Sequence, residues 1–329
     1  MLKPAKLDSA ALAARLQKGD RVALAQAITL AESSLEEHQT LAGKVLKVAF
    51  NPSHSSKRLA ITGVPGAGKS TFINALGTWL CKQGKKVAVL SIDPSSEKSK
   101  GSILGDKTRM EELSREENAF IRPSPSSGEL GGIGRRTREA ILLCEAAGYE
   151  IILIETVGVG QSETEAQHLS DIFLLLLVTG AGDDLQGIKR GIMELADIVV
   201  INKADGANAA TAGHYRQTIA NSVHLFPAMD SGWIPQTLLC SSTESTGIEK
   251  VWNTAISYFE KAELSGYFQE KRKNQNQYWL HRMLEDKLIA DFYNSPVYKT
   301  LKDSPHNELS TTQDIKTALE QYYASLAKK

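Results

Sequence analysis

The residues best suited to chemistry gather in two short motifs. The first, from Gly63 to Ser70, reads Gly-Val-Pro-Gly-Ala-Gly-Lys-Ser and fits the GxxxxGK spacing, followed by Ser or Thr, of a phosphate-binding loop. The second is Asn202-Lys-Ala-Asp205. Each motif follows a short apolar run, the first after Leu59–Thr62 and the second after Ile198–Ile201. Together, and in this order, the two motifs predict a site that binds GTP.

The first motif has the residue types that a phosphate requires. Its glycines let backbone N–H groups turn inward around phosphate oxygens, and the helix expected from Lys69 to about Lys82 directs its positive end at the same charge. Lys69 would pair with the β- and γ-phosphates, and the Ser70 hydroxyl would ligate Mg²⁺. A purely structural glycine turn seldom also places Lys-Ser next. No GxGxxG follows this strand, which argues against a dinucleotide-binding fold.

The second motif has a carboxylate suited to reading guanine. Asp205 can accept hydrogen bonds from both the N1–H and the 2-amino group of that base. Adenine has a lone pair at N1 and no 2-amino group, so a buried carboxylate would stay unpaired against it. The alternative is a loop that caps a helix starting near Gly206. The segment Ser241–Thr243 follows another apolar run, where such domains place a second base-contacting loop.

Three further carboxylates are candidates for a metal and water shell. Asp93 closes the run Val87–Ile92, and a carboxylate at that end of a strand lies near the metal of a P-loop site. Asp106 is a second candidate, and a turn or helix cap is the alternative for both. Glu155 stands where P-loop proteins usually carry Asp, and could reach a Mg²⁺-bound water or orient the attacking water. The N–H of Gly158 could then contact the γ-phosphate. A Glu155 bound only to surface cations is the alternative.

Two glycine-rich loops carry basic residues. They are Gly128–Arg136 and Ala181–Arg190. Loops of this kind can supply a charge to the transition state or sense a partner. Ordinary solvated surface charge is the alternative.

Seven apolar runs predict the strands that position these residues. They are Leu59–Thr62, Val87–Ile92, Ala119–Arg122, Ile151–Ile154, Ile172–Val178, Ile198–Ile201 and Thr237–Leu239. Runs this continuous indicate strands covered on both faces, so the predicted fold class is α/β, a P-loop NTPase core with a mostly parallel sheet covered by helices. Helical periodicity predicts an N-terminal arm, broken at Gly19, and a C-terminal helical region. The expected boundaries are 1–56, 57–262 and 263–329.

Composition and charge bear on the partners and the cellular compartment that we expect for this chain. Its 329 residues include 38 basic and 38 acidic side chains, so the formal net charge is zero. The net charge therefore gives no indication of a nucleic-acid or membrane partner. No window approaches the roughly 18 consecutive apolar residues of a membrane span. The start, Met-Leu-Lys-Pro, lacks the apolar core of a signal peptide. Cys81, Cys144 and Cys240 are far apart, which favours reduced thiols. We expect a soluble, cytoplasmic protein.

The motifs resemble those of one family, the MeaB/ArgK group of P-loop GTPases, which are chaperones of adenosylcobalamin-dependent methylmalonyl-CoA mutase. The resemblance rests on the phosphate-binding loop, Asp93-Pro-Ser-Ser, Ser102-Ile-Leu-Gly-Asp-Lys-Thr-Arg-Met110, Glu155-Thr-Val-Gly-Val-Gly-Gln-Ser162 and Asn202-Lys-Ala-Asp205. It runs through the whole core, and the flanking helical arms also match the family plan.

This resemblance implies slow GTP hydrolysis, coupled to gating of cofactor delivery and to protection of the mutase, in a homodimer built through the C-terminal helices. The catalytic residues would be Lys69, Glu155, Asp93, Asp106 and Lys189, the last in a loop that responds to the partner. The Mg²⁺ shell would comprise Ser70, Asp93, Asp106 and Glu155. The residues expected to contact GTP or GDP are Gly63, Val64, Pro65, Gly66, Ala67, Gly68, Lys69, Ser70, Thr71, Gly158, Asn202, Lys203, Asp205, Ser241, Ser242 and Thr243.

Three other functions remain open on the residues alone. A metallochaperone GTPase for a nickel enzyme would need a His/Cys cluster, whereas the seven histidines are scattered and the cysteines solitary. An ATP-using kinase or transport ATPase conflicts with the base preference expected from Asp205. A scaffold that binds nucleotide without turnover is the third. The sequence does not specify which acyl-CoA mutase would be the client.

Overall fold

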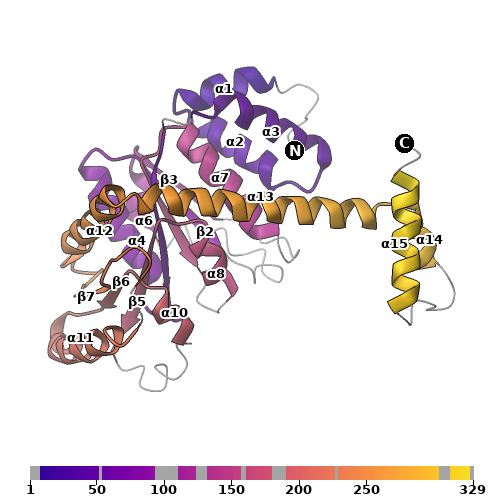
Figure 1. The fold of residues 1–329 in the computed structure, drawn as a ribbon. Helices are drawn as coiled ribbons and strands as arrows, with labels where there is room; N and C mark the ends of the chain where they lie inside the picture. The colour runs from indigo at the N-terminus through magenta and orange to yellow at the C-terminus, as the bar shows by residue number, and fades with distance from the viewer. Residues whose placement is uncertain are drawn as a thin grey trace. The chain divides into compact units, whose positions relative to one another are not determined.

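A parallel sheet of seven strands forms the core that carries both motifs (Figure 1). The strands are β1 (Lys57–Gly63), β2 (Val87–Ile92), β3 (Ala119–Pro123), β4 (Ile151–Thr156), β5 (Ile172–Val178), β6 (Ile198–Asn202) and β7 (Gln236–Leu239). Their order is β3-β2-β4-β1-β5-β6-β7, and all neighbours pair in parallel. All seven predicted runs are strands, so the predicted fold class is confirmed.

The computed structural model describes residues 8–51, 54–92, 110–123, 132–156, 161–179, 190–226, 229–303 and 312–326. By their internal contacts the residues form two units, Met1–Lys273 and Asn274–Lys329. The division falls inside α13 (Tyr267–Tyr293). In the part of the chain that the structure describes, no helix has the length and apolarity that a bilayer crossing requires.

Side chains alternate along each strand, so the sheet packs against helices on both faces. Leu174 and Leu176 of β5 join the core beneath α4 (Lys69–Lys82), α6 (Glu111–Arg115) and α12 (Ile248–Leu264), whereas Leu175 and Leu177 pack toward α10 (Arg190–Glu194) and α11 (Ala209–Val223). On this second face Arg58 meets α7 (Gly132–Ala146), and β1 and β4 meet α8 (Gln161–Gln167). The sheet is therefore buried on both sides.

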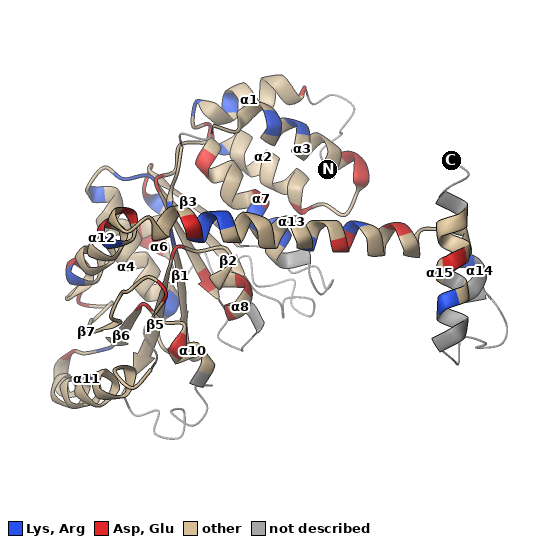
Figure 2. Ribbon diagram, in the orientation of Figure 1, with Lys and Arg blue, Asp and Glu red and all other residues tan. Residues whose placement is uncertain are grey.

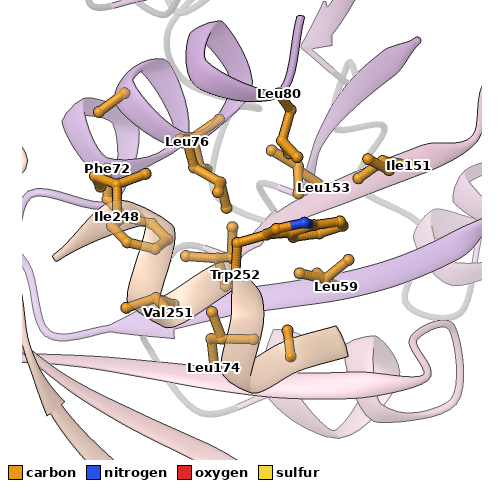
Figure 3. Packing of buried hydrophobic residues seen from close by; sticks show 14 of the residues in the cluster. Leu59, Phe72, Leu76, Leu80, Ile151, Leu153, Leu174, Ile248, Val251 and Trp252 are labelled. Carbon is orange, nitrogen blue, oxygen red and sulfur yellow. The ribbon is translucent and has the colours of Figure 1, made fainter. Parts of the chain in front are cut away.

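The larger core cluster is densely apolar around the first strand. Figure 3 shows Trp252 of α12 lying among leucines that include Leu59 of β1, Leu80 of α4 and Leu153 of β4. These three leucines are almost completely shielded from solvent. Truncating one such leucine to alanine typically costs about 2–5 kcal/mol of stability. This packing holds β1 and α4 against each other, and these are the two elements that the phosphate-binding loop connects.

Three helices precede the sheet: α1 (Ser9–Gln17), α2 (Arg21–Glu32) and α3 (Glu36–Ala49). Asp20 caps α2 by accepting from the N–H groups of Val22 and Ala23, and Gly19 before it has φ +78°. The predicted N-terminal arm and its break at Gly19 are therefore present. The arm packs against α7, and Glu32 accepts a hydrogen bond from Arg122 of β3.

A buried ion cluster lies at the amino ends of β1 and β5. The Asp171 carboxylate accepts from the Arg58 N–H at 2.8 Å and from Arg272 Nη2 at 2.8 Å. Arg58 in turn donates to Glu145 of α7. Removing one partner from such a cluster typically costs about 3–5 kcal/mol, because a buried charge is left uncompensated. The cluster fastens the first turns of α13 to the sheet.

The second unit consists of helices, as the sequence predicts for the C-terminal region. It contains the rest of α13, α14 (Pro296–Asp303) and α15 (Thr312–Leu326). Charged residues of both signs occur along α13 (Figure 2). They include the i,i+4 pairs Arg282–Asp286 and Lys287–Asp291. Phe292 at the end of α13 meets Tyr322 of α15 edge to face, with ring centroids 5.3 Å apart.

Candidate functional site

The phosphate-binding loop connects β1 to α4 and depends on its glycines. A Cβ atom on Gly63 would collide with the carbonyl oxygen of Leu176 on the neighbouring strand. Gly68 has φ +85°, and a Cβ there would come within 2.7 Å of Asn202 Nδ2. Both positions therefore require glycine. Within the loop, Ala67 is buried and Val64 packs partly against both core clusters, whereas Pro65, Gly66 and Thr71 are exposed.

Lys69 is the first residue of α4, and its ammonium points back into the loop. Nζ donates to the carbonyl oxygens of Gly63 at 2.7 Å and Val64 at 3.3 Å. Burial lowers the pKa of this ammonium, and the negative charges of Glu155 and Glu163 partly offset that effect. A half-buried cation beside the amino end of a 14-residue helix makes a strong site for an anion such as a phosphate.

Ser70 and Glu155, both predicted for the metal shell, lie in direct contact. Ser70 Oγ donates to Glu155 Oε1 at 2.8 Å, and Ser91 Oγ lies 3.4 Å from Glu155 Oε2. Glu155 is only 8% exposed, at the carboxyl end of β4. A hydroxyl and a carboxylate are the oxygen ligands that Mg²⁺ prefers, so these residues fit that ion. Asp93 and Asp106 lie outside the described residues, as do Gly158 and Lys189.

Asp205 faces the loop that follows β7. Its Oδ2 accepts a hydrogen bond from Ser241 Oγ, and Thr243 Oγ1 lies 3.4 Å away. The Ala204 N–H donates to the Cys240 carbonyl at 3.0 Å, which joins the two loops through their backbones as well. Ser241 and Thr243 therefore orient the carboxylate that the sequence assigns to the base.

Lys203 lies next to this carboxylate in an uncommon conformation. Its φ of 57° is left-handed, which is rare for a residue other than glycine. Its Cε lies 4.0 Å from the Cβ position of Gly68. The side chain of Lys203 thus extends over the phosphate-binding loop, and strained backbone of this kind is concentrated at functional sites.

Asn202 joins three loops to one another. Its Nδ2 donates to the Ala67 carbonyl at 2.8 Å, and its Oδ1 accepts from Ser242 Oγ at 2.8 Å and from the Ser242 N–H at 3.2 Å. The residue is only 1% exposed. Both ends of this amide are therefore engaged in fastening the phosphate-binding loop to the loops after β6 and β7. The predicted base contact of Asn202 stays a prediction.

Replacing Asn202 with Ala should weaken nucleotide binding as a whole. The change leaves the buried Ala67 carbonyl and Ser242 hydroxyl without their partner, and each such loss costs about 1–3 kcal/mol. We expect the affinities for GTP and GDP to fall together, by about 10- to 100-fold, in a fluorescence titration. Asn221→Ala on the exposed side of α11 is the matched control. An unchanged affinity in Asn202→Ala would contradict this role.

The sequence did not single out Ser91, Thr62 or Glu163. Ser91 gives a weak signal, as the one hydroxyl in the otherwise apolar strand β2. Glu163 gives no sequence signal, because α8 is short and polar. Of the two glycine-rich loops, the structure describes residues 132–136 of the first and only the last residue, Arg190, of the second. In the first, Arg135 pairs with Glu139 of its own helix at 3.3 Å, so this cation has a partner within α7.

Residues 24–296 match the model of a family described as Methylmalonyl Co-A mutase-associated GTPase MeaB. The chain belongs to this family. The resemblance stated from the motifs is thereby confirmed, and the chain is a GTPase of the MeaB family.

The sequence of this chain aligns with those of the following relatives over most of their lengths. The chain is 48% identical over 279 residues to the GTPase ArgK of Escherichia coli K12, covering 85% of this chain and 84% of that protein. It is 43% identical over 291 residues to the mitochondrial methylmalonic aciduria type A homolog of Mus musculus, covering 85% of this chain and 70% of that protein. A crystal structure described as a LAO/AO transport system kinase superposes with a TM-score of 0.73 at 36% identity, over 98% of this chain and 99% of the other.

Proposed function

We propose that this GTPase uses GTP and Mg²⁺ to gate delivery of adenosylcobalamin to a B12-dependent acyl-CoA mutase, methylmalonyl-CoA mutase, and to protect that enzyme. Membership of a family named for association with this mutase carries the proposal. The site supports the GTP-binding part of the proposal, because Asn202 fastens the phosphate-binding loop to the loops that hold Asp205. Asp205 then accepts from the N1–H and 2-amino groups of guanine.

The residues divide the work of hydrolysis between them. Lys69 and the backbone N–H groups from Gly66 to Ser70 bind the β- and γ-phosphates. Ser70 and Glu155 would hold Mg²⁺, which neutralises charge on the phosphate oxygens when bound. Glu155 also orients the attacking water, and its hydrogen bond to Ser70, with Ser91 close by, fixes the carboxylate in advance. Asp93, Asp106, Gly158 and Lys189 complete this proposed set.

The proposed assembly is a homodimer formed through the C-terminal helices of residues 263–329, which follow a GTPase domain of residues 57–262 and an arm of residues 1–56. Leu280, Leu284 and Leu288 support it. They are exposed at i, i+4 and i+8 of α13 and so form one apolar stripe. An unpaired stripe of this kind is typical of a helix that meets another helix. We place the protein in the cytoplasm.

A turnover assay tests the proposed client. The full chain is mixed with methylmalonyl-CoA mutase, with isobutyryl-CoA mutase or with an unrelated acyl-CoA enzyme, and release of phosphate from GTP is followed. We expect one B12-dependent mutase to stimulate hydrolysis and the unrelated enzyme to have no effect. Absence of stimulation by any B12-dependent mutase would overturn the chaperone role and leave the GTPase activity intact.

One observation favours a second candidate. The solved relative is described as a transport system kinase, a title that would suit an ATP-using enzyme. Asp205 opposes this, since adenine gives its carboxylate no donor at N1 or C2. Displacement of labelled GTP by excess ATP separates the two functions, because an ATP-using enzyme would lose the label to ATP and a GTPase would not. No comparable observation favours a nickel metallochaperone or a scaffold without turnover.

A further inference from the structure

A cavity lies at the amino ends of β5 and β6, whereas both nucleotide motifs follow the carboxyl ends of their strands. Its volume is about 280 Å³, near the lower limit for ligand pockets. Its lining includes polar residues and the apolar residues Phe173, Leu195 and Phe226. All the lining residues belong to the first unit of the chain. The cavity is therefore separate from the GTP site, at the opposite edge of the sheet.

Asp197, the residue just before β6, supplies the buried acceptor of this cavity. It lines the cavity and is only 5% exposed. Its Oδ2 accepts from the Phe173 N–H at 2.8 Å, and no other group in the described part of the chain donates to this carboxylate. Buried polar atoms normally have a hydrogen-bond partner. The second oxygen of Asp197 is therefore available to a molecule in the cavity.

The cation nearest to Asp197 is directed elsewhere. Lys271, in the first turns of α13, also lines the cavity, but its Nζ donates to the Asp171 carbonyl oxygen at 2.6 Å. Within the described residues it forms no ion pair with Asp197. Burial raises the pKa of Asp197 to about 6, and the charge of Lys271 and the Phe173 hydrogen bond offset only part of this effect. The cavity therefore lacks the positive charge that this carboxylate requires.

The other charged residues of the lining increase this imbalance. Asp230 and Glu194 add two carboxylates, and Lys271 is the one cation among the lining residues that the structure describes. Negative charge around a cavity with low-dielectric walls favours a positively charged ligand. The apolar part of the wall favours a ligand that also carries hydrocarbon.

We propose that this cavity binds a small organic cation, a primary ammonium on a short apolar chain. The ammonium donates to Asp197, and the chain packs against Phe226 and Leu195. A metal ion fits less well, because Ca²⁺ and Mg²⁺ require six or more oxygen ligands, and the described residues contain no group of three side chains arranged to hold a metal. The proposal does not depend on the proposed function.

Titration of the full chain with n-butylammonium chloride tests the site. The probes for comparison are n-butanol and butyrate, which have the same chain length but no positive charge. Calorimetry is performed at constant ionic strength with GDP in excess, so that the nucleotide site is occupied. We expect saturable binding of butylammonium, and binding of the other two probes that is weaker by about tenfold or more, because a hydrogen bond between opposite charges is lost.

Two variants place the binding in this cavity. Asp197→Asn keeps the shape and an oxygen for the Phe173 N–H but removes the charge, so affinity for butylammonium should fall by about tenfold or more. Leu195→Phe fills the cavity and should prevent binding with the carboxylate intact. Glu260→Gln is the matched control, since Glu260 is an exposed carboxylate of α12 outside the cavity. GDP affinity at the wild-type value would show that each variant is folded.

Three results would overturn the proposal. They are the absence of saturable butylammonium binding to the wild type, equal binding of butanol, and wild-type affinity for butylammonium in a folded Asp197→Asn or Leu195→Phe. A loss of affinity in Glu260→Gln as large as that in Asp197→Asn would also overturn it, because the effect would then come from overall charge. The comparison of the three probes needs no variant, so it decides the matter even if both substitutions prevent folding.

Discussion

Glu155→Gln is expected to remove nearly all GTP hydrolysis while GTP still binds. The glutamine keeps the size of the side chain and an oxygen for Ser70, but it loses the charge that holds the metal shell and orients water. Removing a positioned acid–base or electrostatic group typically lowers kcat by about 10²- to 10⁴-fold. Single-turnover measurement of phosphate release, alongside GTP titration and a melting curve, would show the loss of turnover in a folded protein.

The residue just before the same strand supplies the matched control for this variant. Glu150 lies just before β4, is exposed and pairs with Lys85 on the surface at 2.8 Å. Glu150→Gln should therefore hydrolyse GTP at the wild-type rate. Lys69→Ala should also lose hydrolysis with the fold intact, but with weaker nucleotide binding. Wild-type turnover in both Glu155→Gln and Lys69→Ala would refute the roles assigned to these residues.

Asp205→Asn should lose the preference for guanine. The asparagine amide keeps one oxygen that can accept from the N1–H, but it places an N–H donor opposite the 2-amino group, so one of the two hydrogen bonds is replaced by repulsion between donors. Sites built around buried polar pairs discriminate strongly, and we expect GTP affinity to fall by about 10²- to 10⁴-fold. Xanthine has a carbonyl in place of the 2-amino group, so binding of XTP should improve.

Competition against labelled GTP measures this change. In the wild type, excess unlabelled GTP should displace the label and ATP should not, and equal displacement by ATP would disprove the guanine reading. Glu244→Gln is the control, since Glu244 is an exposed carboxylate next to Thr243 in the same loop. Its competition profile should match that of the wild type.

The sheet could be predicted because parallel strands buried on both faces have a direct sequence signal. Runs such as Ile172–Val178 are apolar throughout, and the structure makes each of them a strand. The phosphate-binding loop could be predicted for a different reason. Its spacing is specific, and the observed α4 begins at Lys69, as the motif requires.

The contacts between loops could not be predicted, since they join residues far apart in the chain. Asn202 reaches Ala67 across 135 residues and Ser242 across 40. Their side chains carry no periodicity that would indicate a neighbour. Glu163 was missed for the same reason, because only the fold brings α8 against Thr62, 101 residues earlier.

The amide of Asn202 has a consequence for the timing of the cycle. It bonds the phosphate-binding loop to the loops after β6 and β7, so nucleotide binding should require little further ordering of these side chains. When the side chains of a site are already ordered, the affinities of related ligands differ mainly in their dissociation rates. We therefore expect the residence time of the spent nucleotide to pace each round. A partner protein that breaks the hydrogen bonds of the Asn202 amide would speed the release of GDP and allow the next round of GTP binding.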